Sequence, residues 1–405
     1  MTLTTISVIV VSRHRPTDLL RCIASLCQQD HPIELIVVAD TRSAEEVRAL
    51  DLPIKLIAFD KANISVARNA GLRHAAGEVA AFIDDDAVAE PTWARRLAEP
   101  FADSRVMQAG GYVIGRNGIS WQWRAIAVDA TGRDHMLVLP DTTTLHEGST
   151  LRAIKTQGTN CAFRRTPLLA SGGFDPALRF YLDDADMNLR LAALGGWTAV
   201  VPNAVVHHGF AASPRRRADR SPLDLHEVGA SSAVFLRRHA PDLALSRLGQ
   251  LRREQRRRLL RLMVSGAIEP QDVSRLLNTL DGGVSEGRYR ILGEMLPLAS
   301  ENAPLLPLKQ VDLQSGAVLS GRPWQKDRLA AQARSLRERG YVVTVIILSP
   351  SVRRHRVRFG PDGIWWQTGG QFGASLRTDP PVAPWRFATR VAREAERLSC
   401  WRAAA

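Results

Sequence analysis

The segment Val79-Ala80-Ala81-Phe82-Ile83-Asp84-Asp85-Asp86 joins an apolar run of strand length to three consecutive carboxylates. We predict a buried strand over Val79–Ile83, because short apolar runs bounded by polar residues are typical of buried strands. Strand and helix patterns alternate around it. Strands are predicted at Ile6–Val11, Glu34–Ala39 and Pro53–Phe59, and helices at Pro16–Gln28, Ala44–Leu50, Ile64–Ala76 and Pro91–Phe101. This alternation predicts an α/β fold with a parallel sheet and crossover helices.

The three carboxylates stand where such a sheet binds ligands, beyond the carboxyl end of a strand. Adjacent carboxylates repel one another and lose hydration there, so their arrangement is costly without a cation. A divalent cation such as Mg²⁺ takes oxygen ligands and usually retains substrate phosphates in its shell. We expect Asp86 to bind the ion and Asp84 to reach a ribose or a metal-bound water, and both residues are predicted to belong to the metal site. The alternative is a solvated acidic turn that caps the helix beginning at Pro91.

Further polar segments follow in a recognisable order. Ser12-Arg13-His14-Arg15-Pro16 follows the first predicted strand, Asp40 follows the second, and Asn63–Gly71 contains Ala67-Arg68-Asn69. Gly172-Gly173-Phe174-Asp175 precedes Tyr181-Leu182-Asp183-Asp184-Ala185-Asp186. Together, over residues 5–210, these segments resemble the family-2 glycosyltransferases, which have the GT-A fold. The resemblance implies an inverting transfer of a sugar from a nucleotide-diphosphate sugar to a hydroxyl acceptor, a glycan or a lipid-linked sugar, with Mn²⁺ or Mg²⁺ as cofactor.

The resemblance also implies roles for the donor side of the site. Ser12 and Asp40 would hold the nucleotide base and ribose, and Arg68 would contact the nucleotide or its phosphates. Asp84 and Asp85 are assigned to donor binding as well. Taken singly, Asp40 could be a plain turn residue and Arg68 a surface helix arginine. Arg13-His14 departs from the tyrosine and asparagine usual in the family, so the donor base is not indicated.

On the acceptor side, the second member of the family's acidic pair is the general base, and here that residue is Asp184. A general base must be ionised at neutral pH and within hydrogen-bond reach of the attacking hydroxyl. Asp183 shares the catalytic assignment, because it stands where the family usually has glutamate. Asp183 or Asp186 could instead be the N-cap of the following helix. Asn160 and Trp197 are predicted to lie on the acceptor side.

A strand is predicted at Thr198–His207, followed by a second histidine, His208. Period-two alternation places His208 on the face of Ala204 and Val206, and His207 on the opposite face. In family members a histidine in this segment can complete the metal shell, and imidazole suits Mn²⁺ better than Mg²⁺. We therefore predict His208 as a metal ligand, with a purely structural histidine as the alternative.

Composition and charge set limits on the class of protein. Hydrophobic residues make up 45% and charged residues 23% of the 405 residues, as in core-forming soluble proteins. The four cysteines form no metal or redox pattern, and the N-terminus lacks the basic region of a secretory signal, so a cytoplasmic protein is expected. The net charge of +13 is carried mainly by arginine. It reflects either codon usage or a basic surface that contacts anionic lipid at the inner membrane face or a phosphorylated acceptor.

Three parts are predicted along the chain: a catalytic domain over 1–230, a basic helical region over 231–303 and a small α/β domain over 304–405. In the last part we expect a strand at Gln310–Leu319, a helix at Gln325–Arg339, a strand at Tyr341–Leu348 and a final helix at Pro384–Leu398. A competing interpretation is a non-catalytic, glycosyltransferase-like scaffold whose basic tail binds an anionic polymer or membrane. No nucleic-acid-binding motif is present in the sequence, so no nucleic-acid partner is expected.

Overall fold

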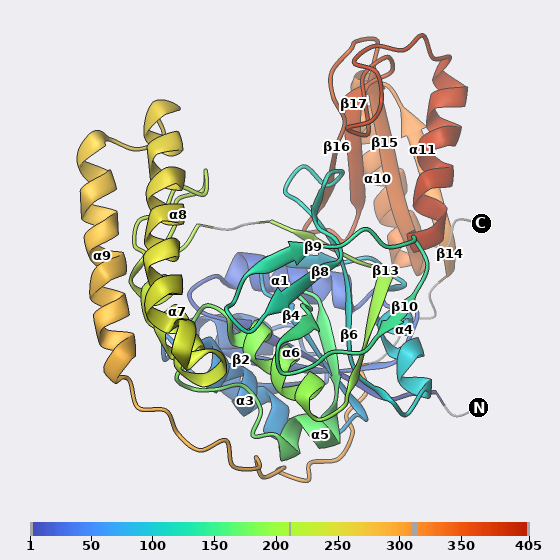
Figure 1. Cartoon of the computed structure of the whole chain (residues 1–405). Coiled ribbons are helices and arrows are strands. Elements are labelled where there is room, and N and C mark those ends of the chain that lie inside the picture. Colours follow the sequence, from blue (N-terminus) through green and yellow to red (C-terminus); the bar gives the residue numbers. More distant parts are fainter. Residues whose placement is uncertain (1–2, 210–211, 309–313, 403–405) are drawn as a thin grey trace.

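The computed structural model describes residues 3–209, 212–308 and 314–402 and has an α/β architecture, as predicted (Figure 1). Its main sheet has the strand order β10-β13-β6-β12-β4-β1-β2-β3, with β5 beside β13 and β7 beside β6. The strands β3, β2, β1 and β4 are parallel neighbours. The bounds are β1 Ile6–Ser12, β2 Ile33–Ala39, β3 Ile54–Ala58, β4 Val79–Asp84, β5 Ala87–Ala89, β6 Val106–Ile114, β7 Trp121–Trp123, β10 Thr144–His146, β12 Cys161–Arg164 and β13 Trp197–His208.

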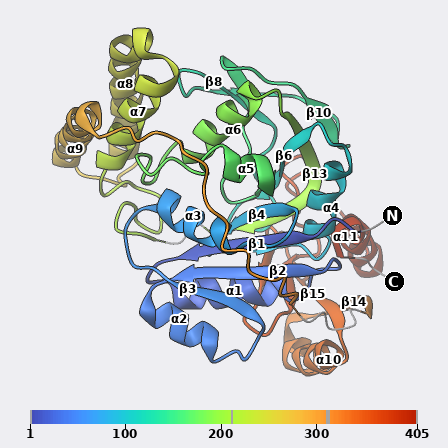
Figure 2. The ribbon, with the colours of Figure 1, turned by 90° about the horizontal axis from the view of Figure 1, so that it is seen from below.

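Helices cover both faces of this sheet, giving three layers (Figure 2). One face packs against α1 (Pro16–Leu26), α2 (Thr41–Arg48) and α4 (Trp93–Ala98) through a large apolar cluster. The other face packs against α3 (Ile64–His74), α5 (Arg165–Ala170) and α6 (Asp183–Ala193). Both faces of the strands are therefore buried, which explains why their sequences are continuously apolar.

Helices α1 and α3 each end two residues before their predicted ends, and α2 and α4 differ at both ends. Local contacts explain the start of α2 and the end of α4. Helix α2 begins at Thr41 rather than Ala44, because the carboxylate of Asp40 accepts a hydrogen bond from the Ser43 backbone amide and caps the helix. Helix α4 ends at Ala98 and continues only as the 3-10 turn Glu99–Ala102. Pro100 cannot donate a backbone hydrogen bond and disfavours the α conformation of the residue before it, so the helix does not extend to Phe101.

The sheet changes direction in its second half. Strand β12 runs antiparallel to both β4 and β6, and β13 runs parallel to β6. Strand β6, which is not among the strands predicted above, spans nine residues between β13 and β12. The pair Gly110-Gly111 within β6 has a low strand propensity, so the sequence pattern does not indicate a strand there. A Cβ at Gly111 would lie 1.8 Å from the Ala204 carbonyl oxygen, so close backbone packing requires glycine there.

A small second sheet lies over one end of the main sheet. It consists of β8 (Ile126–Asp129) between β9 (Asp134–Met136) and β11 (Arg152–Ile154). Val128 and Ala153 of this sheet pack with Leu189 of α6. The segment therefore covers the helix that carries the predicted base.

Three helices form a projecting arm: α7 (His226–His239), α8 (Ala244–Val264) and α9 (Pro270–Tyr289) (Figure 1). Val234 and Phe235 of α7 pack against Leu178 and Leu182 of the first domain. Leu251 of α8 belongs to a separate core that the three helices share. The predicted basic helical region is therefore a helical hairpin anchored to the first domain through α7.

After α9 the chain returns across the first domain in an extended conformation. The Leu298 amide donates to Leu169, and the Leu308 amide donates to Ile33, which holds this segment beside α5 and β2. It leads to the C-terminal unit, a sheet of order β14-β15-β17-β16 with two helices. The bounds are β14 Gln314–Gly321, α10 Lys326–Glu338, β15 Tyr341–Ser349, β16 Arg356–Phe359, β17 Trp365–Gly370 and α11 Phe387–Arg402.

The C-terminal unit has the strand–helix–strand order predicted for it, with shifted ends. The predicted strand Gln310–Leu319 begins at Gln314 within the described part, and its first residues lie outside that part. The last helix starts at Phe387, three residues later than predicted, and extends to Arg402. Among the helices of the described ranges, none has both the length and the apolar character required to cross a membrane.

Candidate metal and donor site

Strand register brings the predicted polar segments together at one edge of the main sheet. Val11 is paired with Asp84 on one side of β1, and Ser12 is paired with Ala39 on the other. Asp40 follows Ala39 directly. The residues that end β1, β2 and β4 therefore lie side by side at the carboxyl edge, as the alternation of strands and helices predicted.

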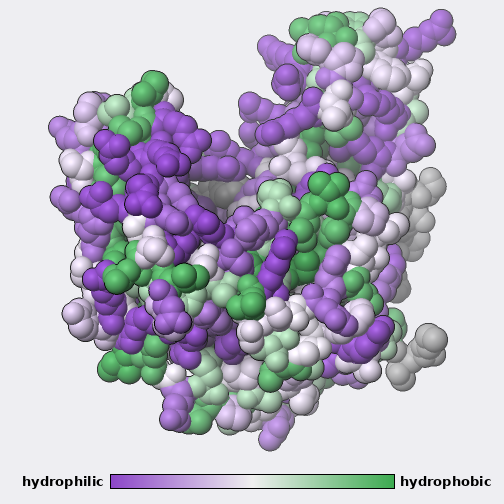
Figure 3. All heavy atoms as spheres, viewed as in Figure 1, coloured by the Kyte–Doolittle hydropathy of each residue, from purple (hydrophilic) through white to green (hydrophobic). Residues whose placement is uncertain are grey.

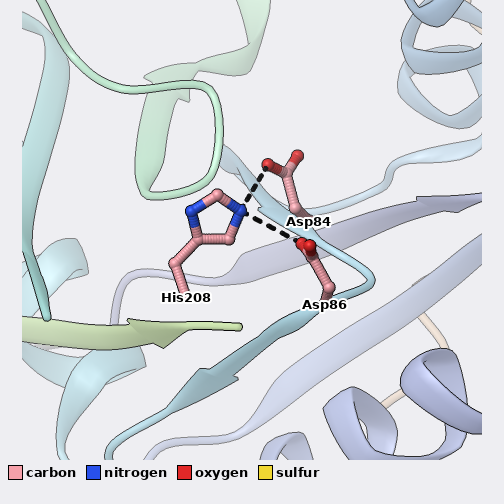
Figure 4. A group of neighbouring side chains, drawn as sticks. All are labelled: Asp84, Asp86 and His208. Carbon is pink, nitrogen blue, oxygen red and sulfur yellow. Dashed lines mark ion pairs between the residues drawn. The ribbon is translucent and has the colours of Figure 1, made fainter. Parts of the chain in front are cut away.

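Asp84, Asp86 and His208 converge into one cluster (Figure 4). His208 Nε2 lies 3.1 Å from an Asp86 oxygen and 3.9 Å from an Asp84 oxygen. Asp86 is 2% exposed and His208 is 5% exposed, so the alternative of a solvated acidic turn is wrong. The three ligand atoms all lie within 4.8 Å of one another.

The chemistry of this cluster fits a divalent cation. Two carboxylates supply hard oxygen ligands, and an imidazole nitrogen is acceptable to Mn²⁺ but a poor ligand for Mg²⁺. Two negative charges this close are also costly to bury without a cation. Part of that charge is balanced by Arg15 and Arg216, whose guanidinium nitrogens lie 3.5 and 3.7 Å from Asp86. The cluster can therefore hold a metal ion beside two further cationic groups.

The His208 ring is held from its other side. Gln122 Nε2 lies 3.4 Å from His208 Nδ1, and the ring of Trp123 lies 5.7 Å from the imidazole, centroid to centroid. For Nε2 to bind a metal, Nδ1 must carry the proton, so the Gln122 amide has to be turned with its oxygen, which is buried without a partner among the described residues, toward Nδ1 to accept from it. His207 points the other way and lies 2.7 Å from Glu90, in agreement with the alternation predicted for this strand.

Asp85, predicted to bind the donor, is turned into the protein. It is fully buried, accepts a hydrogen bond of 2.7 Å from Ser12 Oγ and pairs with Arg15 at 2.5 Å. Burial raises the pKa of Asp85 to about 7, while the positive charge of Arg15 opposes that rise. The hydrogen bond between Ser12 and Asp85 thus holds both side chains in place behind the acidic cluster.

Asp40 is also largely engaged with protein groups. Besides capping α2, it accepts hydrogen bonds from the His14 amide at 2.7 Å and the Ser43 hydroxyl at 2.7 Å. Burial acts to raise its pKa, but the hydrogen bonds from His14 and Ser43 outweigh burial and lower the pKa. Asp40 therefore fixes the backbone after β1 in place as an ionised carboxylate.

A cavity of about 430 Å³ opens beside this edge. Its apolar walls include Phe59, Ile64 and Phe180. Cationic side chains line it as well, namely Arg13, Arg15, Lys61, Arg179 and Arg215, together with Ser12 and His14. Apolar walls with a few cations match the two halves of a nucleotide, a flat base and charged phosphates.

Arg68 connects the metal cluster to the predicted base. The guanidinium lies 3.4 Å from Asp84, donates to the Gly158 carbonyl oxygen at 2.9 Å and forms an ion pair with Asp183. It is 5% exposed, which excludes the alternative of a surface helix arginine. Arg68 thus ties the end of β4 to the start of α6.

The acidic pair opens α6 without capping it. Leu182 is the N-cap, with a φ of 65°, and no side chain caps the helix, so neither Asp183 nor Asp186 has the N-cap role. Burial raises the pKa of Asp183, and Arg68 opposes that effect. Asp184 is only half-buried, and one of its oxygens accepts the Gly158 amide at 3.2 Å. Asp184 is therefore the more accessible carboxylate of the pair.

The two residues predicted on the acceptor side are placed elsewhere. Asn160 is fully buried, donates to the carbonyl oxygens of Tyr112 and Ala204, and accepts from Trp93 Nε1, so it holds strands together. Trp197 begins β13 whereas His208 ends it, and the Trp197 ring stacks under the Arg105 guanidinium at 4.2 Å. An acceptor role for either residue has no support in this geometry.

Three residues of the site had no predicted role: Arg15, Arg216 and Gln122. Arg15 lies three residues after the end of β1, and its position at the carboxyl edge was the signal that could have identified it. Gln122 lies in the short strand β7, and Arg216 lies between β13 and α7. Neither stretch has a sequence pattern that indicates a site, so only the tertiary fold brings these residues to the cluster.

Comparisons with known proteins agree with this geometry. Residues 7–169 match the family model described as glycosyl transferase family 2. A glucosyl-dolichyl phosphate glucuronosyltransferase of Haloferax volcanii is 28% identical over 159 residues, covering 37% of this chain and 48% of that protein. The chain thus spans about half the length of this curated relative.

Several solved structures are similar to part of this chain. A mannosyltransferase of Pyrobaculum calidifontis, in complex with GDP-Man and Mn²⁺, has 17% identity and a TM-score of 0.43, covering 71% of this chain and 88% of that chain. GalNAc-T7 with UDP, GalNAc and Mn²⁺ has 16% identity and a TM-score of 0.42, covering 58% and 50%. TarS of S. aureus has 20% identity and a TM-score of 0.39, covering 70% and 54%. Over residues 7–169, the family match and the order of the motifs both show similarity to glycosyl transferase family 2.

Proposed function

We propose that this protein transfers a sugar from a nucleoside-diphosphate sugar to a hydroxyl acceptor, with inversion at the anomeric carbon. The observation that carries the proposal is the convergence of Asp84, Asp86 and His208 at the edge of the sheet, in a domain similar to glycosyl transferase family 2. These three residues would hold Mn²⁺ or Mg²⁺, with Mn²⁺ favoured by the imidazole ligand. A bound divalent cation would neutralise the charge that develops on the leaving diphosphate.

The neighbouring cavity supports the donor assignment. Phe59 and Ile64 offer apolar contact to a base, while Arg13 and Lys61 offer positive charge to phosphate oxygens. Ser12 and Asp40, first assigned to the donor itself, hold the loop after β1 that forms one wall of this cavity. Arg68, Asp84 and Asp85 complete the donor side by holding the end of β4 in place.

Asp184 is the proposed general base. Asp183 is engaged in a buried ion pair with Arg68, so its carboxylate is not exposed to an acceptor hydroxyl. Asp184 lies next to it at the start of α6 and is only half-buried. It would take the proton of the acceptor hydroxyl as the hydroxyl oxygen bonds to the anomeric carbon and the bond to the diphosphate breaks. One displacement inverts the configuration and needs no covalent intermediate.

The test compares Asp184→Asn with Asp183→Asn in a donor-turnover assay with Mn²⁺. Asp184→Asn should reduce turnover at least about 100-fold, the contribution typical of a general base, while nucleotide affinity is retained. Asp183→Asn should weaken stability through the loss of its pair with Arg68. Normal turnover by Asp184→Asn would contradict the base assignment. The anomeric configuration of the product, read by NMR, tests inversion separately.

We also propose that α8 contacts an anionic surface, as expected for a lipid-linked acceptor at the cytoplasmic membrane face. Leu245 is 74% exposed and Val264 is 84% exposed at the two ends of α8. Exposed arginines lie between them: Arg252, Arg253, Arg256, Arg257, Arg258 and Arg261. Figure 3 shows the hydrophilic surface of this arm and the hollow between it and the C-terminal unit. Vesicle sedimentation should show binding to anionic but not neutral lipid, and reversal of Arg256 and Arg257 to glutamate should abolish it.

The alternative function is a non-catalytic scaffold of the same fold, whose basic arm binds an anionic polymer. A scaffold would bind without reacting, so donor turnover distinguishes the two. The buried acidic cluster and the half-buried Asp184 favour the enzyme. Burying carboxylates lowers the stability of the fold, and a scaffold that only binds would not need them.

A further inference from the structure

Asp86 and His208 belong to one short antiparallel ladder. Strand β5 follows Asp86 directly and pairs with the end of β13, with His208 opposite Ala87. The Gly209 amide donates to the Asp86 carbonyl oxygen at 2.8 Å, and the Glu90 amide donates to Val205 at 3.0 Å. The distance between the two proposed metal ligands therefore depends on the register and rigidity of this ladder.

A side chain of the C-terminal unit binds the ladder at the end away from Asp86 and His208. Arg402, in the last turn of α11, donates Nε to one carboxylate oxygen of Glu90 at 2.8 Å and Nη2 to the other at 2.7 Å. Glu90 is fully buried and Arg402 is 3% exposed. His207 Nε2 lies 2.7 Å from the same carboxylate. The Glu90 carboxylate thus joins both strands of the ladder to α11.

Arg402 is itself held by the sheet of the C-terminal unit. Its guanidinium carbon lies 3.8 Å from the centre of the Trp365 ring, and Nη1 donates to Thr344 Oγ1 at 3.1 Å. The Trp365 ring also lies 5.0 Å from the ring of His207, centroid to centroid. A planar guanidinium that stacks on an aromatic ring and donates hydrogen bonds from all three of its nitrogens has little freedom to move.

Apolar contacts surround this ion pair on both strands. Val88 of β5 belongs to a cluster with Phe359 and Trp365, and Val205 of β13 belongs to a cluster with Leu398 and Trp401. Water is thereby kept from the pair, and removal of one charge would leave the other buried without a partner. The contact is therefore a strong and directional one between residues 312 positions apart.

We infer that the C-terminal unit serves as a clamp on the metal-binding strands, with Arg402 and Glu90 as positioning residues for Asp86 and His208. This inference rests on the proposed cation site. Metal sites tolerate small displacements of their ligands poorly, and loss of an outer partner typically lowers metal affinity 10- to 100-fold. The clamp gives the C-terminal unit a role in the reaction of the first domain without a second active site.

The first experiment measures Mn²⁺ affinity of the full chain by calorimetry, without nucleotide, for wild type and Arg402→Met. We expect the Kd to rise by about 10- to 100-fold in the variant. The matched control is Arg393→Met, which removes an ion pair of 2.6 Å with Asp379 inside the C-terminal unit. The control should change the Kd less than twofold, and Arg402→Lys, which keeps the charge, should recover part of the affinity.

The second experiment follows backbone hydrogen exchange in the metal-free protein. Arg402→Met should speed exchange at 86–90 and 204–209, whereas Arg393→Met should not. A role of Arg402 confined to the stability of the C-terminal unit would leave these peptides unchanged. This readout does not depend on metal, so it separates a failure of the clamp from a failure of the cation site.

A folded Arg402→Met protein with wild-type Mn²⁺ affinity and wild-type exchange would overturn the inference. If that variant does not fold, Glu90→Gln replaces it with the same expectations, because glutamine keeps the shape and one acceptor. Wild-type protein that binds no Mn²⁺ would instead refute the cation site, and unchanged exchange in the variants would refute the clamp itself.

Discussion

Asp186 offers a quantitative test of how α6 is held in place. It is fully buried, pairs with Arg190 at 2.9 Å and with His239 at 2.8 Å, and lies two residues after the proposed base. Burial alone would raise its pKa, but Arg190 and His239 outweigh burial and lower the pKa from 3.8 to about 2. Asp186→Asn removes the charge while preserving the shape of the side chain.

The size of the effect follows from linkage between protonation and folding. A shift of nearly two pKa units corresponds to about 2.5 kcal/mol of stability at neutral pH. Because the folded pKa is the lower one, this stability is present above pH 4 and is lost as the pH falls toward 2. About half of it should remain at pH 3.

The assay is urea denaturation of wild type and Asp186→Asn, followed by circular dichroism between pH 7 and pH 3. The free energy of unfolding should differ by about 2.5 kcal/mol at pH 7, and this difference should shrink by about half at pH 3. Asp327→Asn, at an exposed position on α10, is the control and should change stability by less than about 0.5 kcal/mol. A difference that stays constant with pH would refute the reasoning.

Two further substitutions test the packing of the site. Gly111→Ala should destabilise the protein by about 1–3 kcal/mol, because the new Cβ would lie 1.8 Å from the Ala204 carbonyl oxygen; an unchanged melting temperature would contradict this. Arg68→Met should cost about 3–5 kcal/mol of stability, because it leaves buried Asp183 without its cation. In chemical denaturation, a loss below 1 kcal/mol would show that the pair with Asp183 is weak.

The sequence predicted the parts of the site that depend on strand order. Asp84, Asp86 and His208 each end or follow a strand, so a parallel sheet with the predicted alternation brings them to one edge. The predicted strands and crossover helices are confirmed for the same reason, since continuous apolar runs and helical spacing determine them locally. Errors there were confined to the ends of helices and strands, two of which are explained by Asp40 and Pro100.

Other features depend on contacts that no local pattern records. Glu90 and Arg402 pair although they lie 312 positions apart in the sequence. The sequence of α11 by itself indicates only a basic helix. Trp197 was predicted on the acceptor side, but it begins β13, whereas His208 ends that strand. Arg68 was predicted to contact the nucleotide or its phosphates, and in the structure its guanidinium is buried against Asp84, Asp183 and Gly158.

The central claim is that Asp84, Asp86 and His208 bind a divalent cation together with a nucleoside diphosphate. The most direct test is calorimetric titration of UDP, GDP, dTDP and CMP, each with and without Mn²⁺, against wild type and Asp86→Ala. We predict that at least one nucleotide binds only with Mn²⁺ and that Asp86→Ala abolishes this binding. Binding to no nucleotide in either condition, or the same Mn²⁺-dependent binding by Asp86→Ala, would contradict the claim.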